Sequence, residues 1–298
     1  MKEDNMIVNK LKENKLIENV TVGEERAFYG MLDTRFVGCA IDGEEDGESA
    51  FKECRRIELE SCRMALRYPL WHVENCAVEN SRFESSCRAP MWYCRDISLH
   101  GCQLLGVKAV RECENVSFAD SHAISAEFGW KTRGFTATDS SIEGEYLFLD
   151  GSDISLDRVK IKGKYTFQYV KNAVIRSCVL DTKDAFWHSE NVTVYDSVVK
   201  GEYLGWYSKG LRLVRCEISG TQPLCYAEGL VLEDCTMTGC DLSFEKSEVE
   251  ATVIGGIDSV KNPECGRITA GSVGEVISED GRERRTALVT DGGISRMI

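Results

Sequence analysis

A nineteen-residue repeat constrains this chain more than any other feature of its sequence. In lines of nineteen from residue 171, the chain reads KNAVIRSCVLDTKDAFWHS, ENVTVYDSVVKGEYLGWYS, KGLRLVRCEISGTQPLCYA and EGLVLEDCTMTGCDLSFEK. Units in the same pattern extend back to residue 55, and a looser unit begins near residue 32, where EEDGES lengthens a turn. A fixed repeat of this kind indicates a solenoid, in which each unit buries its apolar side by stacking on its neighbours.

We number the positions of the repeat as slots 1 to 19. Slots 3, 5 and 10 are apolar, slot 8 is mostly Cys or Ser, and slot 12 is often Gly. This pattern predicts two short strands joined by a tight turn, then a Gly turn and a third strand over slots 14 to 19. Strands that pair with their copies at about 4.8 Å predict an all-β, right-handed, single-stranded parallel β-helix with three short strands per coil.

The repeat also predicts the domain organisation. We expect an N-terminal cap over residues 1–19, eleven to twelve coils over residues 20–257, and a C-terminal capping segment and tail over residues 258–298. Two other solenoids fit less well. LRLVRCEI resembles the strand of a leucine-rich repeat, but the second half of each unit is aromatic and strand-like. A left-handed hexapeptide helix needs an apolar residue every six positions, which slots 3, 5, 8 and 10 do not supply.

Units such as ENVTVYDS and the late segment NPECGRITAGSVGEVI give the chain a family resemblance. The sequence resembles the right-handed parallel β-helix, or pectin-lyase-like, superfamily. More closely, it is similar to an uncharacterised bacterial family known only as a domain of unknown function. The resemblance extends over roughly residues 20 to 278 and implies a fold without an activity.

Composition limits the partners of the chain. Its formal net charge of −13 offers no basic surface for nucleic acid or for an anionic membrane, so we expect neither partner. The first twenty residues lack the apolar core of a signal peptide, which predicts a cytoplasmic protein. Its fourteen cysteines are then expected to be reduced thiols.

Three slots have structural interpretations. Slot 8 is expected to face inward at a corner that accepts only a small residue; a metal ladder is the alternative, but Ser in the same slot argues against it, and we expect no metal and no cofactor. Slot 1 alternates in charge and predicts a ladder of ion pairs. All five Trp occupy slot 17, which predicts a stacked interior row. The cysteines of slot 8 are Cys39, Cys62, Cys102, Cys178, Cys216 and Cys235.

The third strand is expected to carry function. Because slot 18 holds many ionisable residues, slots 14, 16 and 18 are predicted to face water and slots 15, 17 and 19 to face the core. An aromatic binding face would then stack sugar rings, receive another protein or pair with a second copy of the chain as a homodimer, unless the tail from residue 258 covers it. Its predicted binding residues are Tyr146, Phe148, Tyr165, Phe167, Tyr169, Phe186, His188 and Tyr207.

An enzyme is the alternative to this binding or scaffold protein. Glu112, Lys131 and Asp150 share slot 18 on successive coils, which would place the two carboxylates about 9 to 10 Å apart. Such a group could serve a polysaccharide lyase or a glycoside hydrolase, with Lys131 as the base. An ion-pair stack explains the same three residues. His72 and His188 share slot 18 six coils apart, so we expect them to recur with the scaffold rather than to act together.

Overall fold

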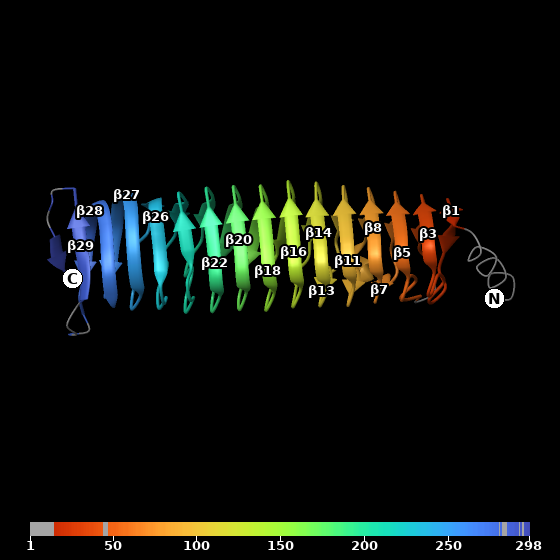
Figure 1. Ribbon diagram of the computed structural model, residues 1–298, viewed down its shortest axis with the longest axis horizontal. Helices are drawn as coiled ribbons and strands as arrows, with labels where there is room; N and C mark the ends of the chain where they lie inside the picture. Colours follow the sequence, from red (N-terminus) through yellow and green to blue (C-terminus); the bar gives the residue numbers. More distant parts are fainter. Residues whose placement is uncertain (1–14, 44–46, 280, 282–284, 292, 294) are drawn as a thin grey trace. The chain divides into compact units, whose positions relative to one another are not determined.

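The computed structural model describes residues 15–43, 47–279, 281, 285–291, 293 and 295–298. The predicted N-terminal cap therefore lies mostly outside the described residues. The chain divides into two compact units, Met1–Gly144 and Glu145–Ile298. Each unit is a parallel β-solenoid in which every coil repeats the path of the one before it (Figure 1).

Unit 1 has strands on three sides of its coils. A 3₁₀ helix, η1 (Ser85–Cys87), interrupts one coil. The first side consists of β1 (Leu16–Glu18), β3 (Leu32–Val37), β5 (Arg55–Glu60), β8 (Glu74–Glu79), β11 (Arg95–His100), β14 (Glu114–Ala119) and β16 (Arg133–Thr138). The second side consists of β2 (Thr21–Val22), β4 (Ala40–Ile41), β6 (Arg63–Met64), β9 (Arg82–Phe83), β12 (Gln103–Leu104), β15 (His122–Ile124) and β17 (Ser141–Gly144). In the described part of unit 1, the strands of the third side are β7 (Leu70–Trp71), β10 (Met91–Trp92) and β13 (Val110–Arg111).

Unit 2 repeats the first two sides, and its last coils have longer strands. The first side consists of β18 (Ser152–Asp157), β20 (Lys171–Arg176), β22 (Glu190–Tyr195) and β24 (Arg212–Val214), and the second of β19 (Lys160–Lys164), β21 (Val179–Lys183), β23 (Val198–Lys200) and β25 (Glu217–Ser219). The long strands β26 (Leu230–Thr238), β27 (Glu248–Lys261) and β28 (Cys265–Ile277) follow, and then β29 (Arg285–Thr290) and β30 (Ser295–Met297).

The strands pair in the register that the repeat predicts. Within unit 2, Ala173 of β20 lies opposite Val192 of β22, so slot 3 pairs with slot 3 of the next coil. The two units together contain about 14 turns of about 19 residues, more than the eleven to twelve predicted. The difference lies at the ends, because β1 already pairs with β3 inside the predicted cap and β28 and β29 continue the parallel pairing after residue 257. At the end of unit 2, β30 pairs antiparallel with β29.

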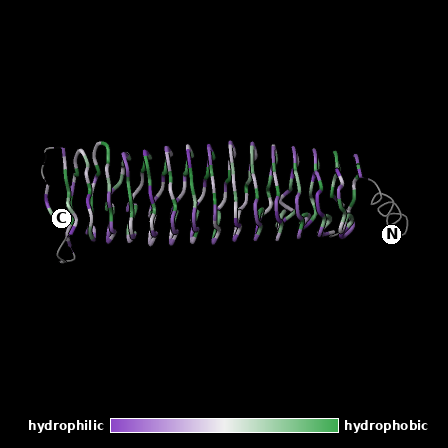
Figure 2. Tube along the Cα trace, viewed as in Figure 1, coloured by the Kyte–Doolittle hydropathy of each residue, from purple (hydrophilic) through white to green (hydrophobic). Residues whose placement is uncertain are grey.

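Inward slots form the core of each unit as predicted. Val192, Val194 and Leu180 in slots 3, 5 and 10 are fully buried, and hydrophobic segments recur from coil to coil (Figure 2). All fourteen cysteines are free, and the six in slot 8 are buried. Several of these thiols donate to backbone carbonyls, as Cys178 Sγ does to Arg176 O at 3.0 Å. The prediction that slot 8 accepts a small inward residue is therefore confirmed.

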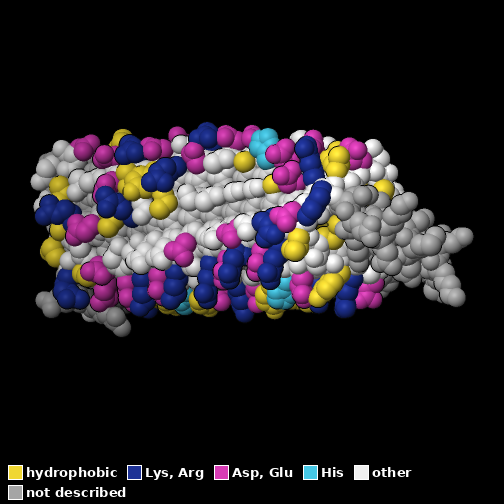
Figure 3. Space-filling model, turned by 45° about the vertical axis from the view of Figure 1, so that its right-hand side comes forward, with side chains coloured by type: hydrophobic (Ala, Val, Ile, Leu, Met, Phe, Trp, Pro, Cys, Tyr) yellow, Lys and Arg dark blue, Asp and Glu magenta, His cyan; other side chains and the backbone are white. Residues whose placement is uncertain are grey.

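The predicted ladder of slot 1 is present on the surface. Arg95 lies 3.0 Å from Glu114 in unit 1, and Lys171 lies 3.3 Å from Glu190 in unit 2. Basic and acidic side chains accordingly follow one another in rows (Figure 3). Since these side chains are about half exposed, each pair contributes well under about 1 kcal/mol and acts mainly on strand register.

The third side departs from the predicted strand. In unit 2, slots 14 to 19 form turns whose alternate residues have positive φ, as in Asp184 (56°), Phe186 (63°) and His188 (53°). Their N–H groups donate alternately to the two neighbouring coils, from Phe186 to Thr166 O and from His188 to Trp206 O, both at 2.9 Å. These bonds satisfy the backbone without an extended ladder, which keeps the unusual φ values in place.

The predicted orientation of this side is wrong for slots 16 and 17. Phe148, Phe167 and Phe186 were expected on the binding face but are at most 1% exposed, so they are core residues. Conversely, the five Trp, which were expected in the core, are only partly buried. Side chains alternate between two faces only along an extended backbone. Positive φ at every second residue removes this alternation of side chains between two faces, so the adjacent slots 15 and 16 both face inward.

Candidate functional site

Unit 2 carries a cluster of aromatic side chains along its third side. We call this cluster the aromatic face. Five of its members are among the binding residues predicted from the sequence, whereas Trp187 and Trp206 were expected in the core. It consists of Tyr146, Tyr165, Tyr169, Trp187, His188, Tyr203, Trp206, Tyr207 and Tyr226.

An outer row of rings occupies slot 18. Tyr169, His188 and Tyr207 stack at centroid distances of 5.0 and 5.1 Å with planes 2° and 8° apart, and Tyr226 follows at 5.1 Å. Tyr169 is 49% exposed and Tyr207 is 46% exposed. The backbone fixes this spacing, because Tyr169 N donates to Trp187 O and His188 N donates to Trp206 O, in each case on the next coil. The outer row therefore presents ring edges and polar tips to solvent, with one ring from each coil.

Two further rows lie between the outer row and the second side. In slot 17, Trp187 stacks on Trp206 at 5.3 Å. In slot 14, Tyr146 stacks on Tyr165 at 4.9 Å. Edge contacts join the two rows, since Tyr165 meets Trp187 at 73° and Tyr203 meets Trp206 at 69°. The rows thus form one aromatic surface across the third side.

Polar contacts hold the rings of this surface in place. Trp187 Nε1 donates to the backbone carbonyl of Tyr203 at 2.7 Å. At one end of the outer row, the Lys246 ammonium lies 5.4 Å from the ring centroid of Tyr226. Partial burial, and then the Glu245 carboxylate, raise the pKa of the Tyr226 hydroxyl, so this group stays a hydrogen-bond donor at neutral pH.

A groove of about 560 Å³ borders the slot-14 row. Asp181, Lys183, Lys200 and Glu202 line its sides, and Lys183 Nζ donates to Glu202 Oε2 at 2.6 Å. Gly201 also lines the groove, and a Cβ on this residue would lie 1.6 Å from the carbonyl oxygen of Thr182. This groove was not predicted from the sequence. The recurrent Gly of slot 12 was the available signal, and it was interpreted only as a turn.

The predicted catalytic residues are divided between the two units. Glu112 and Lys131 lie on neighbouring coils of unit 1, where Glu112 N donates to Trp130 O at 2.8 Å. The Glu112 carboxylate lies 3.3 Å from Arg111 Nε, and Arg111 also lies 3.4 Å from Glu127. Lys131 is exposed and makes no ion pair with any described residue. Asp150 is an exposed residue of unit 2. In unit 1 the contacts of Glu112 are those of an ion-pair network.

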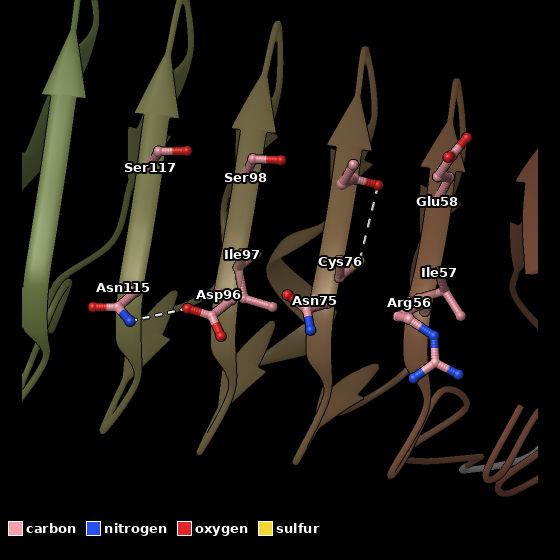
Figure 4. A pocket seen from close by; sticks show the side chains of 11 residues that line it. Arg56, Ile57, Glu58, Asn75, Cys76, Asp96, Ile97, Ser98, Asn115 and Ser117 are labelled. Atoms are coloured by element: carbon pink, nitrogen blue, oxygen red, sulfur yellow. Dashed lines mark hydrogen bonds between the residues drawn. The ribbon is translucent and has the colours of Figure 1, made fainter. Parts of the chain in front are cut away.

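A shallow concavity of about 470 Å³ lies on the first side of unit 1 (Figure 4). Arg56, Asn75, Asp96 and Asn115 line one edge, and all have φ between 52° and 57°. Asn115 Nδ2 donates to Asp96 Oδ1 at 2.9 Å. Asn and Asp tolerate positive φ better than most residues, so this slot-2 row is explained by the backbone it must adopt.

The described residues contain neither a metal-binding cluster nor a membrane-spanning helix. No three side chains of His, Cys, Asp or Glu among them are grouped to hold a metal ion. Within the same residues, no helix has the length and apolarity needed to cross a membrane. The predicted cytoplasmic location, the homodimer and the absence of a nucleic-acid partner stay predictions.

Solved structures with similar folds share little sequence with this chain. The surface adhesin PfbA of Streptococcus pneumoniae is 8% identical, with 89% of this chain and 86% of that chain covered and a TM-score of 0.40. The catalytic domain of a GH87 α-1,3-glucanase is 10% identical, with 97% and 66% covered and a TM-score of 0.41. The A-module of a mannuronan C-5 epimerase from Azotobacter vinelandii is 10% identical, with 92% and 87% covered and a TM-score of 0.31.

The family of the chain follows from its sequence. A comparison with curated proteins found no match. Residues 15–289 match a family described as "Protein of unknown function (DUF3737)", which confirms the predicted resemblance to a domain of unknown function. Because the match extends over nearly all of the sequence, the chain belongs to this family.

Proposed function

We propose that unit 2 binds a linear glycan along its aromatic face. The observation that carries this proposal is the outer row of Tyr169, His188, Tyr207 and Tyr226, whose rings repeat at 5.0 to 5.1 Å. The row is a surface feature, since Tyr169 and Tyr207 are almost half exposed. A row of exposed aromatic rings marks a binding surface more often than a solvated one.

The chemistry of the row favours a polyol over an apolar partner. Each ring covers part of its neighbour's face, so the edges and the polar tips remain for a ligand. Phenolic hydroxyls donate and accept hydrogen bonds, and the imidazole of His188 can do both at its two nitrogens. A linear glycan carries hydroxyl groups and apolar C–H faces at a regular repeat. Such a ligand can use rings and polar tips together, which a purely apolar partner cannot do.

The groove beside the slot-14 row gives a second line of support. It provides about 560 Å³ along the same unit, with Lys183, Lys200 and Glu202 available to hydrogen-bond sugar hydroxyls. Charged side chains at its edge are already paired with one another, as Lys183 is with Glu202. Because these ammonium groups are paired, the groove suits a neutral or cationic chain better than a polyanion.

Binding should be measured by isothermal titration calorimetry with linear oligosaccharides of increasing length. Cello-, laminari-, manno- and chito-oligosaccharides serve as the probes. We expect affinity for one of these series to rise with chain length up to about the number of rings in the outer row. Tyr207→Ala should weaken that binding about tenfold, which corresponds to about 1.4 kcal/mol and to the loss of one stacking ring.

The matched control is Tyr29→Ala in unit 1. Tyr29 is 45% exposed, donates to Glu53 and takes part in no ring stack of the described residues. Its removal should leave the affinity unchanged. If no oligosaccharide binds, or if Tyr29→Ala weakens binding as much as Tyr207→Ala, the proposal is wrong. A concentration-dependent dimer that Tyr207→Ala abolishes, without any sugar binding, would instead identify the face as an assembly surface.

A further inference from the structure

The slot-14 row of the aromatic face is interrupted by a carboxylate. Tyr146 and Tyr165 stack on successive coils, Asp184 occupies the next position, and Tyr203 follows. Backbone hydrogen bonds fix this order, because Tyr165 N donates to Lys183 O at 2.8 Å and Asp184 N donates to Glu202 O at 2.9 Å. Asp184 therefore stands where the row would otherwise contain a ring, between two tyrosines.

Asp184 is buried and unpaired. Only 4% of its surface is exposed, and its carboxylate makes no hydrogen bond or ion pair with any described residue. Burial of a carboxylate without a partner is costly. Desolvation accordingly raises the pKa of Asp184. A ligand with a positive charge would stabilise the ionised form of such a carboxylate more than a neutral ligand would.

The charges around Asp184 are already balanced. Lys183 Nζ pairs with Glu202 Oε2 at 2.6 Å, and Lys164 Nζ lies 3.5 Å from Glu145 Oε1. Each lysine is thus paired with another carboxylate, and both ammonium groups act on Asp184 only as more distant positive charges that oppose the rise in its pKa. Both ammonium groups also lie 5.2 Å from tyrosine ring centroids, Lys164 at Tyr165 and Lys183 at Tyr203. The rings of this region are thus already in contact with cations.

Aromatic rings lie on the coils next to Asp184, and the two residues before it line a groove. Tyr165 and Trp187 meet edge to face with centroids 6.4 Å apart, and Trp187 Nε1 is bonded to the backbone of Tyr203. Ring faces attract ammonium groups and the C–H bonds next to them, because of the ring quadrupole. Thr182 and Lys183, the two residues before Asp184, line the groove of about 560 Å³.

We propose that Asp184, with Tyr165, Trp187 and Tyr203, forms a subsite for the protonated amine of an amino sugar. This inference rests on the proposed function, since it assigns a ligand class to one position of the same aromatic face. The ammonium pairs with the Asp184 carboxylate, and the sugar ring that carries it lies against these aromatic rings. An acetylated amine has no charge to pair with Asp184 and should be bound less tightly.

The test compares two tetrasaccharides that differ only at nitrogen. The deacetylated chito-tetraose and its N-acetylated counterpart are titrated into the full chain at a mildly acidic pH, where the free amines are protonated. We expect the deacetylated form to bind at least about tenfold more tightly, a ratio typical of a charge-assisted contact. Asp184→Asn should remove this preference, because the amide keeps the shape of the side chain and loses its charge.

Two further variants separate the subsite from general attraction. Glu217→Gln removes one exposed charge from β25, outside the aromatic face, and should keep the full preference. Tyr203→Leu keeps an apolar side chain without a ring and should reduce the preference, which gives a second test if Asp184→Asn fails to fold. Circular dichroism establishes that each variant is folded.

The outcomes distinguish the two proposals. Tight binding of a neutral oligosaccharide without any preference for the free amine would overturn the subsite and leave the proposed function standing. A preference that survives Asp184→Asn, or that Glu217→Gln removes equally, would overturn the subsite in favour of attraction to the negative net charge. If neither tetrasaccharide nor any neutral oligosaccharide binds, both proposals are wrong.

Discussion

The ring of Phe167 stacks on the ring of Phe186 at a centroid distance of 5.2 Å, with the two planes 9° apart. Phe148 extends the same stack at 5.4 Å on the other side of Phe167. All three rings are buried, each on a residue with φ between 61° and 63°. A backbone conformation that most side chains avoid thus places an aromatic column inside unit 2.

Removal of the middle ring should destabilise unit 2 strongly. Phe167→Ala is expected to lower the free energy of unfolding by about 3–5 kcal/mol, because it leaves a cavity between two rings that cannot close over it. Tyr169→Ala, two residues away and half exposed, should lower it by about 1 kcal/mol, the value of one stacking contact. Urea unfolding followed by circular dichroism gives both values. Equal losses for the two variants would contradict the buried position of Phe167.

The glycines of slot 12 should differ in their tolerance of a methyl group. A Cβ at Gly201 would lie 1.6 Å from Thr182 O, whereas a Cβ at Gly239 meets no atom within 4 Å. Gly201→Ala should therefore lower the free energy of unfolding by at least about 2 kcal/mol, because the backbone has to move. Gly239→Ala, with φ of 64°, should lower it by about 1 kcal/mol from backbone strain alone. Comparable melting temperatures for the two variants would show that the Gly201 backbone can shift freely.

Asp184 should make the protein less stable at neutral pH than at acid pH. Desolvation raises the pKa of Asp184 in the folded chain above the usual value of an aspartate, about 3.8, so the folded state holds the proton more tightly than the unfolded state does. As pH rises from the unfolded-state pKa of Asp184 to its raised folded-state pKa, the folded state progressively loses stability relative to the unfolded state. Above the raised pKa this loss is complete. Asp184→Asn should therefore raise the melting temperature at neutral pH, by an amount that shrinks toward zero below pH 3.8.

Thermal unfolding of the Asp184→Asn variant across this pH range checks the prediction. Asp181→Asn, on the same coil but exposed, serves as the control and should give no such gain. A lower melting temperature for Asp184→Asn at neutral pH would mean that the charged carboxylate stabilises the fold.

The cysteines should react slowly while the chain is folded. Burial raises the pKa of Cys87, Cys225 and Cys240 to about 12, so these thiols stay protonated at neutral pH. Thiolate is the reactive form, and a buried thiol is also inaccessible. Cys265 is the one cysteine that is only partly buried. Titration with a chromogenic disulfide reagent should modify about one thiol quickly and the rest only in denaturant; rapid modification of several thiols in the folded chain would contradict this.

The repeat in the sequence determined the solenoid and much of its core. Stacking of identical slots is a local consequence of a fixed period, so slots 3, 5, 8 and 10 could be assigned inward without knowledge of the turns. The charge ladder of slot 1 follows for the same reason, and Lys171 and Glu190 pair as expected. The number of coils was underestimated because β28 and β29 keep the parallel pairing after the nineteen-residue pattern has lapsed.

Only the tertiary structure decided what the third side of each coil presents. The sequence pattern suggested a strand, in which Phe186 would face water and Trp187 the core. In the fold, hydrogen bonds to the coils on both sides hold Asp184, Phe186 and His188 at positive φ. Asp and His tolerate positive φ but Phe does not, so local propensity alone does not specify this conformation. The neighbouring coils do, because they provide the acceptors. For this reason the sequence could name Tyr169, His188 and Tyr207 as surface residues, but it could not show that Asp184 is buried between two tyrosines.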